Sequence, residues 1–149
     1  LRPFAMEVVA WDPVQLREVF ERHGVRRVEL DDLLATSDVV SLHVPQMPET
    51  VRMLGARRLA RLKPGATLIN TSRGDVLDEP ALIDLLRERA DLTAVLDVTD
   101  PEPPRPDSPL FELPNVVLTP HIAGSYGPEC ARMGALALDE LERWVTARP

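Results

Sequence analysis

Short apolar runs alternate with helical segments along the chain, and this alternation restricts the possible folds more than any other feature. The apolar runs are hydrophobic on both faces, as are the strands of a parallel sheet that helices cover on both sides. The helical segments between the runs supply the crossovers that parallel strands need. The pattern predicts an α/β protein with a doubly wound, Rossmann-type parallel sheet. Strands are predicted over residues 6–11, 26–29, 38–44, 66–71, 92–98 and 116–119.

Capping residues and glycines place the helical segments between these strands. Asp12 followed by Pro13 is typical of a helix start, and Gly24 predicts the end of the same helix. Asp78 is predicted to cap a later helix that carries Pro80 in its first turn. Prolines concentrated between residues 101 and 120 indicate one long, stiff loop. Helices are predicted over residues 13–22, 31–34, 49–62, 81–89 and 129–145.

Charge and composition favour a small-molecule ligand over a macromolecular one. The net charge of −7 disfavours nucleic acid and anionic membranes, and an aromatic content of 4% leaves few platforms for base stacking. No apolar stretch approaches the roughly 18 residues of a membrane span. A single cysteine, Cys130, excludes a disulfide within the chain, and no charged-then-apolar leader precedes the first strand. We therefore expect a cytoplasmic protein without nucleic-acid or membrane partners.

Polar residues follow five of the predicted strands. In open parallel sheets, ligands bind outside the carboxyl ends of the strands, so these positions are where chemistry is expected. A purely structural domain has no need of polar groups there. No spacing of histidine, cysteine and carboxylates indicates a metal site. The strand-end residues are Asp12, then 43–45, then 71–74, then Asp97, and finally 119–124.

Three of these residues and one loop carboxylate suggest particular roles. Arg73 offers a planar fork that suits a carboxylate and an adjacent carbonyl oxygen, and Gly74 after it is expected to leave room for a ligand. A histidine is the usual proton donor to a carbonyl near neutral pH, which makes His121 a candidate acid, and Glu102 in the preceding loop is a candidate partner for its ring. Surface pairing of Arg73 and simple packing of His121 are the alternatives.

Two aspartates allow both a functional and a structural interpretation. Asp12 can accept hydrogen bonds from the ribose hydroxyls of an adenosine and repel a 2′-phosphate, or it can serve only as a helix cap. Asp97 ends an apolar strand, where an unpaired carboxylate is costly. Its partner is either a ligand amide or arginine, or the backbone amides of a nearby loop.

Five segments together resemble a known family. The strings VVAWDP, SDVVSLHVPQMPET, LKPGATLINTSRGDVLDEPALIDLL, AVLDVTDPEPP and LPNVVLTPHIAGS are similar, in order and spacing, to the cofactor-binding domain of the D-isomer-specific 2-hydroxyacid dehydrogenases, the phosphoglycerate dehydrogenase-like family. The resemblance implies that Arg73 binds the substrate carboxylate and keto oxygen, that His121 is the acid/base, and that Glu102 pairs with His121. It also implies a 2-hydroxy or 2-keto acid substrate, NAD rather than NADP, and a homodimer.

The resemblance also implies a cofactor site along the strand ends. Asp12 would hold the adenosine ribose, and Val44 and Pro45 would form the wall on the adenine side. The nicotinamide end would be lined by Thr71, Ser72, Arg73, Asp97, His121, Ala123 and Gly124.

One family motif is missing, and it changes the expected domain organisation. The chain contains no Gly-x-Gly-x-x-Gly, the loop that holds a pyrophosphate at a helix N-terminus. We expect residues 1–149 to be a partial dinucleotide-binding domain, with the first strand and the glycine loop upstream and the substrate domain outside the chain. Loss of a central strand predicts unpaired edges in the middle of the sheet. The alternative is a non-catalytic relative that senses a dinucleotide or binds a partner; the presence of Arg73, Glu102 and His121 together favours the enzyme.

Overall fold

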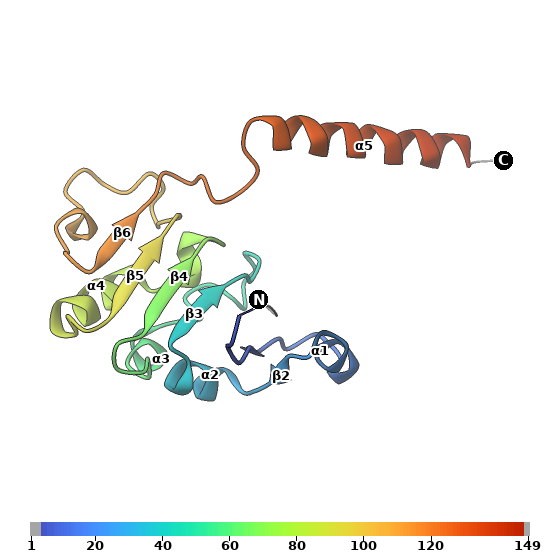
Figure 1. Cartoon of the computed structure of the whole chain (residues 1–149). Helices are drawn as coiled ribbons and strands as arrows, with labels where there is room; N and C mark the ends of the chain where they lie inside the picture. Colours follow the sequence, from blue (N-terminus) through green and yellow to red (C-terminus); the bar gives the residue numbers. More distant parts are fainter. Residues whose placement is uncertain (1–3, 148–149) are drawn as a thin grey trace.

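The computed structural model describes residues 4–147, and within them six strands form two separate parallel sheets (Figure 1). The strands of the larger sheet lie side by side in chain order. The parallel α/β architecture of the Rossmann type is therefore confirmed. The smaller sheet contains β1 (Val9–Ala10) and β2 (Arg26–Arg27), and the larger contains β3 (Val39–Leu42), β4 (Thr67–Asn70), β5 (Thr93–Leu96) and β6 (Val116–Leu118).

α-Helices connect the strands from β1 to β5, and the helix ends follow the capping signals in two cases. The first helix ends at Gly24, which adopts the left-handed conformation with a φ of 64° and donates its amide to the carbonyls of Phe20 and Glu21. Asp78 caps the helix that follows β4, as predicted, by accepting the Ala81 amide. The helices are α1 (Arg17–His23), α2 (Leu30–Thr36), α3 (Ala56–Leu59), α4 (Glu79–Glu88) and α5 (Pro128–Thr146), with short 3-10 turns η1 (Gly74–Val76) and η2 (Pro109–Phe111).

Two predicted helices are shorter than expected. The helix predicted from residue 13 begins at Arg17, because the Asp12 side chain accepts the amides of Val14 and Gln15 and so holds a separate turn. The helix predicted over 49–62 is reduced to α3. Leu54 instead forms a parallel bridge with Leu77, and this long-range pairing overrides the local helical preference.

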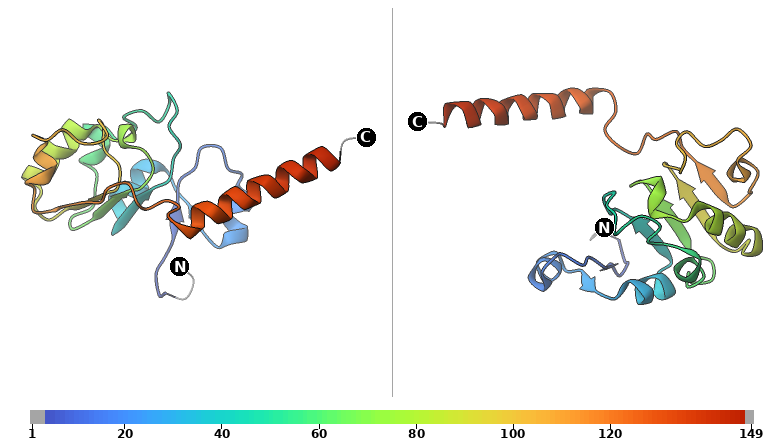
Figure 2. Two further views of the ribbon diagram at one scale, coloured as in Figure 1. Left: turned by 90° about the horizontal axis from the view of Figure 1, so that it is seen from above. Right: turned by 180° about the vertical axis from the view of Figure 1, so that it is seen from behind.

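The core lies between the larger sheet and three helices, α2, α3 and α4. The strands bury alternate residues, and those residues share one apolar cluster with the inward faces of the helices. Figure 2 shows these helices on one side of the sheet. The other face is less protected, since Val39 and Val117 are 57% and 50% exposed. The cluster includes Leu34, Val40, Leu42, Leu59, Leu68, Leu82, Leu86, Ala94 and Leu96.

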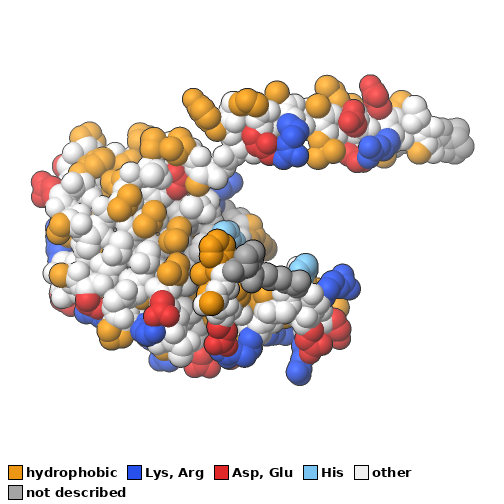
Figure 3. Space-filling model, viewed as in Figure 1, with side chains coloured by type: hydrophobic (Ala, Val, Ile, Leu, Met, Phe, Trp, Pro, Cys, Tyr) orange, Lys and Arg blue, Asp and Glu red, His pale blue; other side chains and the backbone are white. Residues whose placement is uncertain are grey.

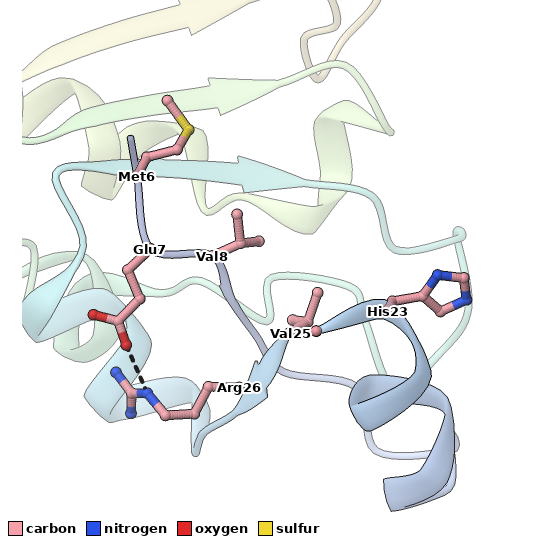
Figure 4. A pocket seen from close by; sticks show the side chains of 7 residues that line it. Met6, Glu7, Val8, His23, Val25 and Arg26 are labelled. Carbon is pink, nitrogen blue, oxygen red and sulfur yellow. Dashed lines mark hydrogen bonds and ion pairs between the residues drawn. The ribbon is translucent and has the colours of Figure 1, made fainter. Parts of the chain in front are cut away.

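The β1–β2 pair is not hydrogen-bonded to the larger sheet in the described part of the chain. Within residues 4–147 the strand pairing is therefore interrupted between β2 and β3. A pocket opens beside the smaller sheet. In Figure 4 the side chains of Met6, Val8 and Val25 lie on the same side of the two paired segments. Glu7, just before β1, forms an ion pair of 2.8 Å with Arg26 of β2.

The last helix, α5, extends away from the rest of the molecule (Figures 1 and 2). None of its residues, 128–146, is buried. Apolar and charged side chains both lie on its surface (Figure 3). Across residues 4–147, no helix has the length and apolar composition that crossing a bilayer requires. The large exposed apolar residues of α5 are Met133, Leu136, Leu138, Leu141, Trp144 and Val145.

The capping contact at α4 leads to a stability prediction. Asp78→Ala removes the side-chain acceptor for the Ala81 amide, which lies 3.3 Å from Oδ1. We expect the free energy of unfolding to fall by about 1 kcal/mol, measured by urea denaturation. Asp84→Ala is the matched control, because Asp84 is exposed on the same helix and makes only a surface ion pair with Arg87. Equal losses in the two variants would show that the cap is unimportant.

Candidate functional site

The carboxyl ends of β3 and β4 form a pocket that contains several of the predicted site residues. Leu42 and Asn70, the last residues of these strands, are paired in the register of the sheet, so the segments that follow them begin side by side. The pocket is lined by His43, Val44, Pro45, Gln46, Thr71, Ser72 and Arg73. The pocket beside β1 and β2 contains none of the predicted site residues, so we place the candidate site at the carboxyl ends of β3 to β6.

A buried asparagine shapes the turn that carries Arg73. Asn70 is fully buried, and its Oδ1 accepts both the amide and the hydroxyl of Ser72, at 3.0 and 2.8 Å. Its Nδ2 donates to the carbonyl oxygen of Arg73 at 2.9 Å. The guanidinium of Arg73 donates in turn to the carbonyl of Ser72. Asn70 was not predicted as a site residue, although an asparagine whose side chain accepts the amide two residues later forms an Asx turn.

Gly74 brings the Arg73 turn against the loop that carries Glu102. A Cβ at position 74 would lie 2.0 Å from the carbonyl oxygen of Thr99, so two backbone segments meet there without any side chain between them. The expectation that Gly74 leaves room for a ligand is wrong, because the Thr99 carbonyl occupies that room. The start of the same loop is also tied to α4, since the Asp100 amide donates to Glu79 Oε2 at 3.1 Å. Burial raises the pKa of Glu79 above its ordinary value.

Glu102 and His121 form a direct pair. His121 Nδ1 lies 2.5 Å from Glu102 Oε1, and the two side chains are 50% and 41% exposed. Because an ionised carboxylate can only accept, Nδ1 carries the hydrogen in this contact, and Nε2 is left to exchange a proton. His121 has a φ of 51°, in the left-handed region, and its amide donates to the Thr119 carbonyl.

Asp97 is buried at the end of β5 and accepts three hydrogen bonds from the segment around His121. They come from the Thr119 hydroxyl at 2.5 Å and from the amides of Ile122 and Ala123 at 2.9 Å each. Burial raises the pKa of this carboxyl, but the three donors, with the charge of His121, outweigh burial and hold the pKa below its ordinary value. Asp97 is therefore ionised at neutral pH.

Two predicted residues lie outside these clusters. Asp12 follows β1 in the smaller sheet, where its Oδ1 is engaged by the amides of its own turn. Gly124 lies in open space, since a Cβ there would meet nothing within 4 Å. At the edge of the pocket Gln46 donates to Asp75 at 2.7 Å, a contact between distant segments that the sequence did not predict. Among residues 4–147, no group of three histidine, cysteine or carboxylate side chains could hold a metal ion.

The arrangement combines an anion-binding group with a proton-transfer pair. Arg73 supplies a fixed positive charge at the end of β4. The His121–Glu102 pair can donate or remove a proton and stabilise the charged imidazolium. Such a set suits a substrate with a carboxylate next to a carbonyl or hydroxyl group.

Comparison with known proteins identifies one matching family. The D-isomer specific 2-hydroxyacid dehydrogenase NAD-binding domain matches residues 1–123. Glyoxylate reductase of Korarchaeum cryptofilum is 45% identical over 139 residues, which are 93% of this chain and 42% of that protein. D-3-phosphoglycerate dehydrogenase of Archaeoglobus fulgidus is 38% identical over 144 residues, 97% of this chain and 27% of that protein. The chain thus spans less than half the length of either relative.

A solved structure shows the same fold. The structure of D-lactate dehydrogenase from Aquifex aeolicus, complexed with NAD and lactic acid, superposes with a TM-score of 0.78 at 32% identity. The match covers 97% of this chain and 48% of that one.

Proposed function

Because the chain belongs to the D-isomer specific 2-hydroxyacid dehydrogenase family, within its NAD-binding domain, we propose that it serves an enzyme that interconverts 2-keto acids and D-2-hydroxy acids with NAD(H). The observation that carries this proposal is the 2.5 Å contact between His121 and Glu102, on the same sheet edge as Arg73. A module that only binds a partner has no need of a carboxylate-paired imidazole on the same sheet edge as an arginine.

The residues at the strand ends fit the cofactor. The pocket after β3 and β4 combines the apolar side chains of Val44 and Pro45, which suit the adenine side of the cofactor, with the polar groups of Thr71 and Ser72, which suit its nicotinamide end. Asp12 lies after β1, is partly exposed and carries a negative charge that repels a 2′-phosphate. These features support NAD over NADP. When bound, NADH supplies the hydride.

The proposed residue roles follow from the charges at the site. Arg73 binds the substrate carboxylate and keto oxygen and so orients the carbonyl carbon. His121 Nε2 protonates the oxygen that becomes the hydroxyl group, and it takes that proton back in the reverse direction. Glu102 keeps the ring oriented through Nδ1 and stabilises the imidazolium. Ala123 and Gly124 extend the same edge beside His121.

The proposal predicts a measurable activity of the full-length gene product. We expect it to oxidise NADH with at least one of glyoxylate, hydroxypyruvate and pyruvate, with NADPH a poorer donor, as followed by absorbance at the nicotinamide band. Lack of activity with every 2-keto acid, combined with tight NADH binding, would instead support a dinucleotide sensor. The homodimer and the cytoplasmic location expected from the sequence stay predictions.

A further inference from the structure

We propose that Asp97 is a positioning residue for the acid/base histidine: it holds the left-handed turn at His121 in place from inside the fold. This inference rests on the proposed function for its catalytic consequence, because the role of His121 comes from that proposal. It differs from the direct cofactor contact that the sequence suggested for Asp97. Its structural basis is the set of hydrogen bonds that Asp97 accepts.

These bonds lie on both sides of His121 along the chain. Oδ1 accepts the Thr119 hydroxyl before the histidine and the Ile122 amide after it, and Oδ2 accepts the Ala123 amide. One buried carboxylate therefore joins the residues that flank His121. A carboxylate offers roughly four acceptor positions, and three of these are already used within the chain.

The backbone at His121 needs such support. Its φ of 51° lies in a region that non-glycine residues adopt only when their surroundings hold them there. The segment after it supplies little packing, because residues 121–127 are exposed and nothing in α5 is buried. The support for this turn must come from the β5 side of the chain.

Asp97 is itself firmly placed. It follows β5, which lies between β4 and β6 in the sheet, and its amide donates to the Asn70 carbonyl at 2.9 Å. The residue is only 4% exposed. Asn70 also shapes the Arg73 turn, so the two turns that carry Arg73 and His121 are anchored by adjacent strands. The position of the histidine relative to the arginine is thereby fixed by the sheet.

The first test needs no substitution. Ile122 and Ala123 are exposed residues, and the amides of exposed residues normally exchange their protons quickly. We expect these two amides to exchange at least about tenfold more slowly than the neighbouring amides of Gly124 and Ser125, by NMR on the full-length protein. Free exchange at both positions would overturn the proposal, whatever the enzyme does.

The second test separates positioning from cofactor contact. Asp97→Asn keeps the shape but replaces one acceptor oxygen by an NH2 group, which cannot accept an amide. In the full-length protein we expect kcat to fall at least about tenfold while Kd for NADH stays within about threefold. Thr119→Val removes one donor and leaves the carboxylate, so its effect on kcat should be smaller. If Asp97 instead acts by contact with the cofactor, Kd for NADH rises and kcat at saturating NADH is retained.

The two proposals fail in different ways. A wild-type enzyme that reduces no 2-keto acid contradicts the proposed function, and the amide-exchange result still decides whether Asp97 holds the turn. An active wild-type enzyme whose Asp97→Asn variant keeps its full kcat contradicts the positioning role alone. Thermal unfolding of each variant shows whether it remains folded, and the wild-type exchange measurement applies even if Asp97→Asn does not fold.

Discussion

Replacing His121 with alanine is expected to lower kcat for 2-keto acid reduction by about 10²–10⁴-fold, the usual contribution of a positioned acid/base. The physical reason is that the hydroxyl oxygen loses its proton donor, while the surfaces that contact NADH remain. Kd for NADH should therefore stay within about threefold of wild type. Steady-state kinetics of the full-length protein and NADH fluorescence titration measure the two quantities.

Two further variants test whether the loss of kcat is specific to the His121–Glu102 pair. Glu102→Gln keeps a side-chain carbonyl that can accept from His121 Nδ1, but it removes the negative charge that stabilises the imidazolium. Its loss of kcat should be smaller than that of His121→Ala. His23→Ala removes an imidazole from α1, the helix between the two strands of the smaller sheet, and should leave kcat unchanged. Wild-type turnover by His121→Ala would refute the assigned role.

Gly74→Ala is expected to produce the largest loss of stability, about 3 kcal/mol or more, at the upper end of what overpacking usually costs. The added Cβ would lie 2.0 Å from the Thr99 carbonyl oxygen and 2.8 Å from the Asp100 nitrogen. Both are backbone atoms, so no side chain can move aside. The two segments must separate, which displaces Arg73 and Glu102 together. Urea denaturation and kcat should both register the change.

Gly134→Ala provides the matched control. It adds the same methyl group within α5, where nothing lies within 4 Å of the new atom. Alanine is favoured over glycine in a helix by roughly 0.5–1 kcal/mol, so this variant should not be destabilised. A Gly74→Ala protein as stable as wild type would mean that the two backbone segments do not meet as described.

Local sequence signals predicted the elements whose cause is local. Gly24 ends α1 and Asp78 begins α4, because capping depends on residues within one turn. The predicted helix over 49–62 is too long because Leu54 pairs with Leu77, a contact between segments well separated in sequence. Hydrophobic periodicity carries no information about such a contact.

The site residues also divide into those that the sequence could identify and those whose roles depend on contacts in space. Strand-end placement selected Arg73, Asp97 and His121 together with Glu102 in the preceding loop, and the family resemblance then implied the roles of Arg73, Glu102 and His121. The functions of Gly74 and Asn70 depend on what lies opposite them in space, namely the Thr99 carbonyl and the backbone of the following turn. For Asp97 the sequence left ligand contact and loop contact open, and the three donors from 119–123 establish the loop contact.

The exposed position of α5 has a mechanical consequence for the active site. The sheet and its three helices bury the core without α5. The 19 residues of this helix are therefore connected to the sheet through the segment that follows β6. His121 lies in that segment, just beyond the last strand. Any force that a bound protein or domain exerts on α5 therefore reaches the turn of the histidine before it reaches the core. The three hydrogen bonds to the buried Asp97 are among the contacts that hold the histidine turn against such a force.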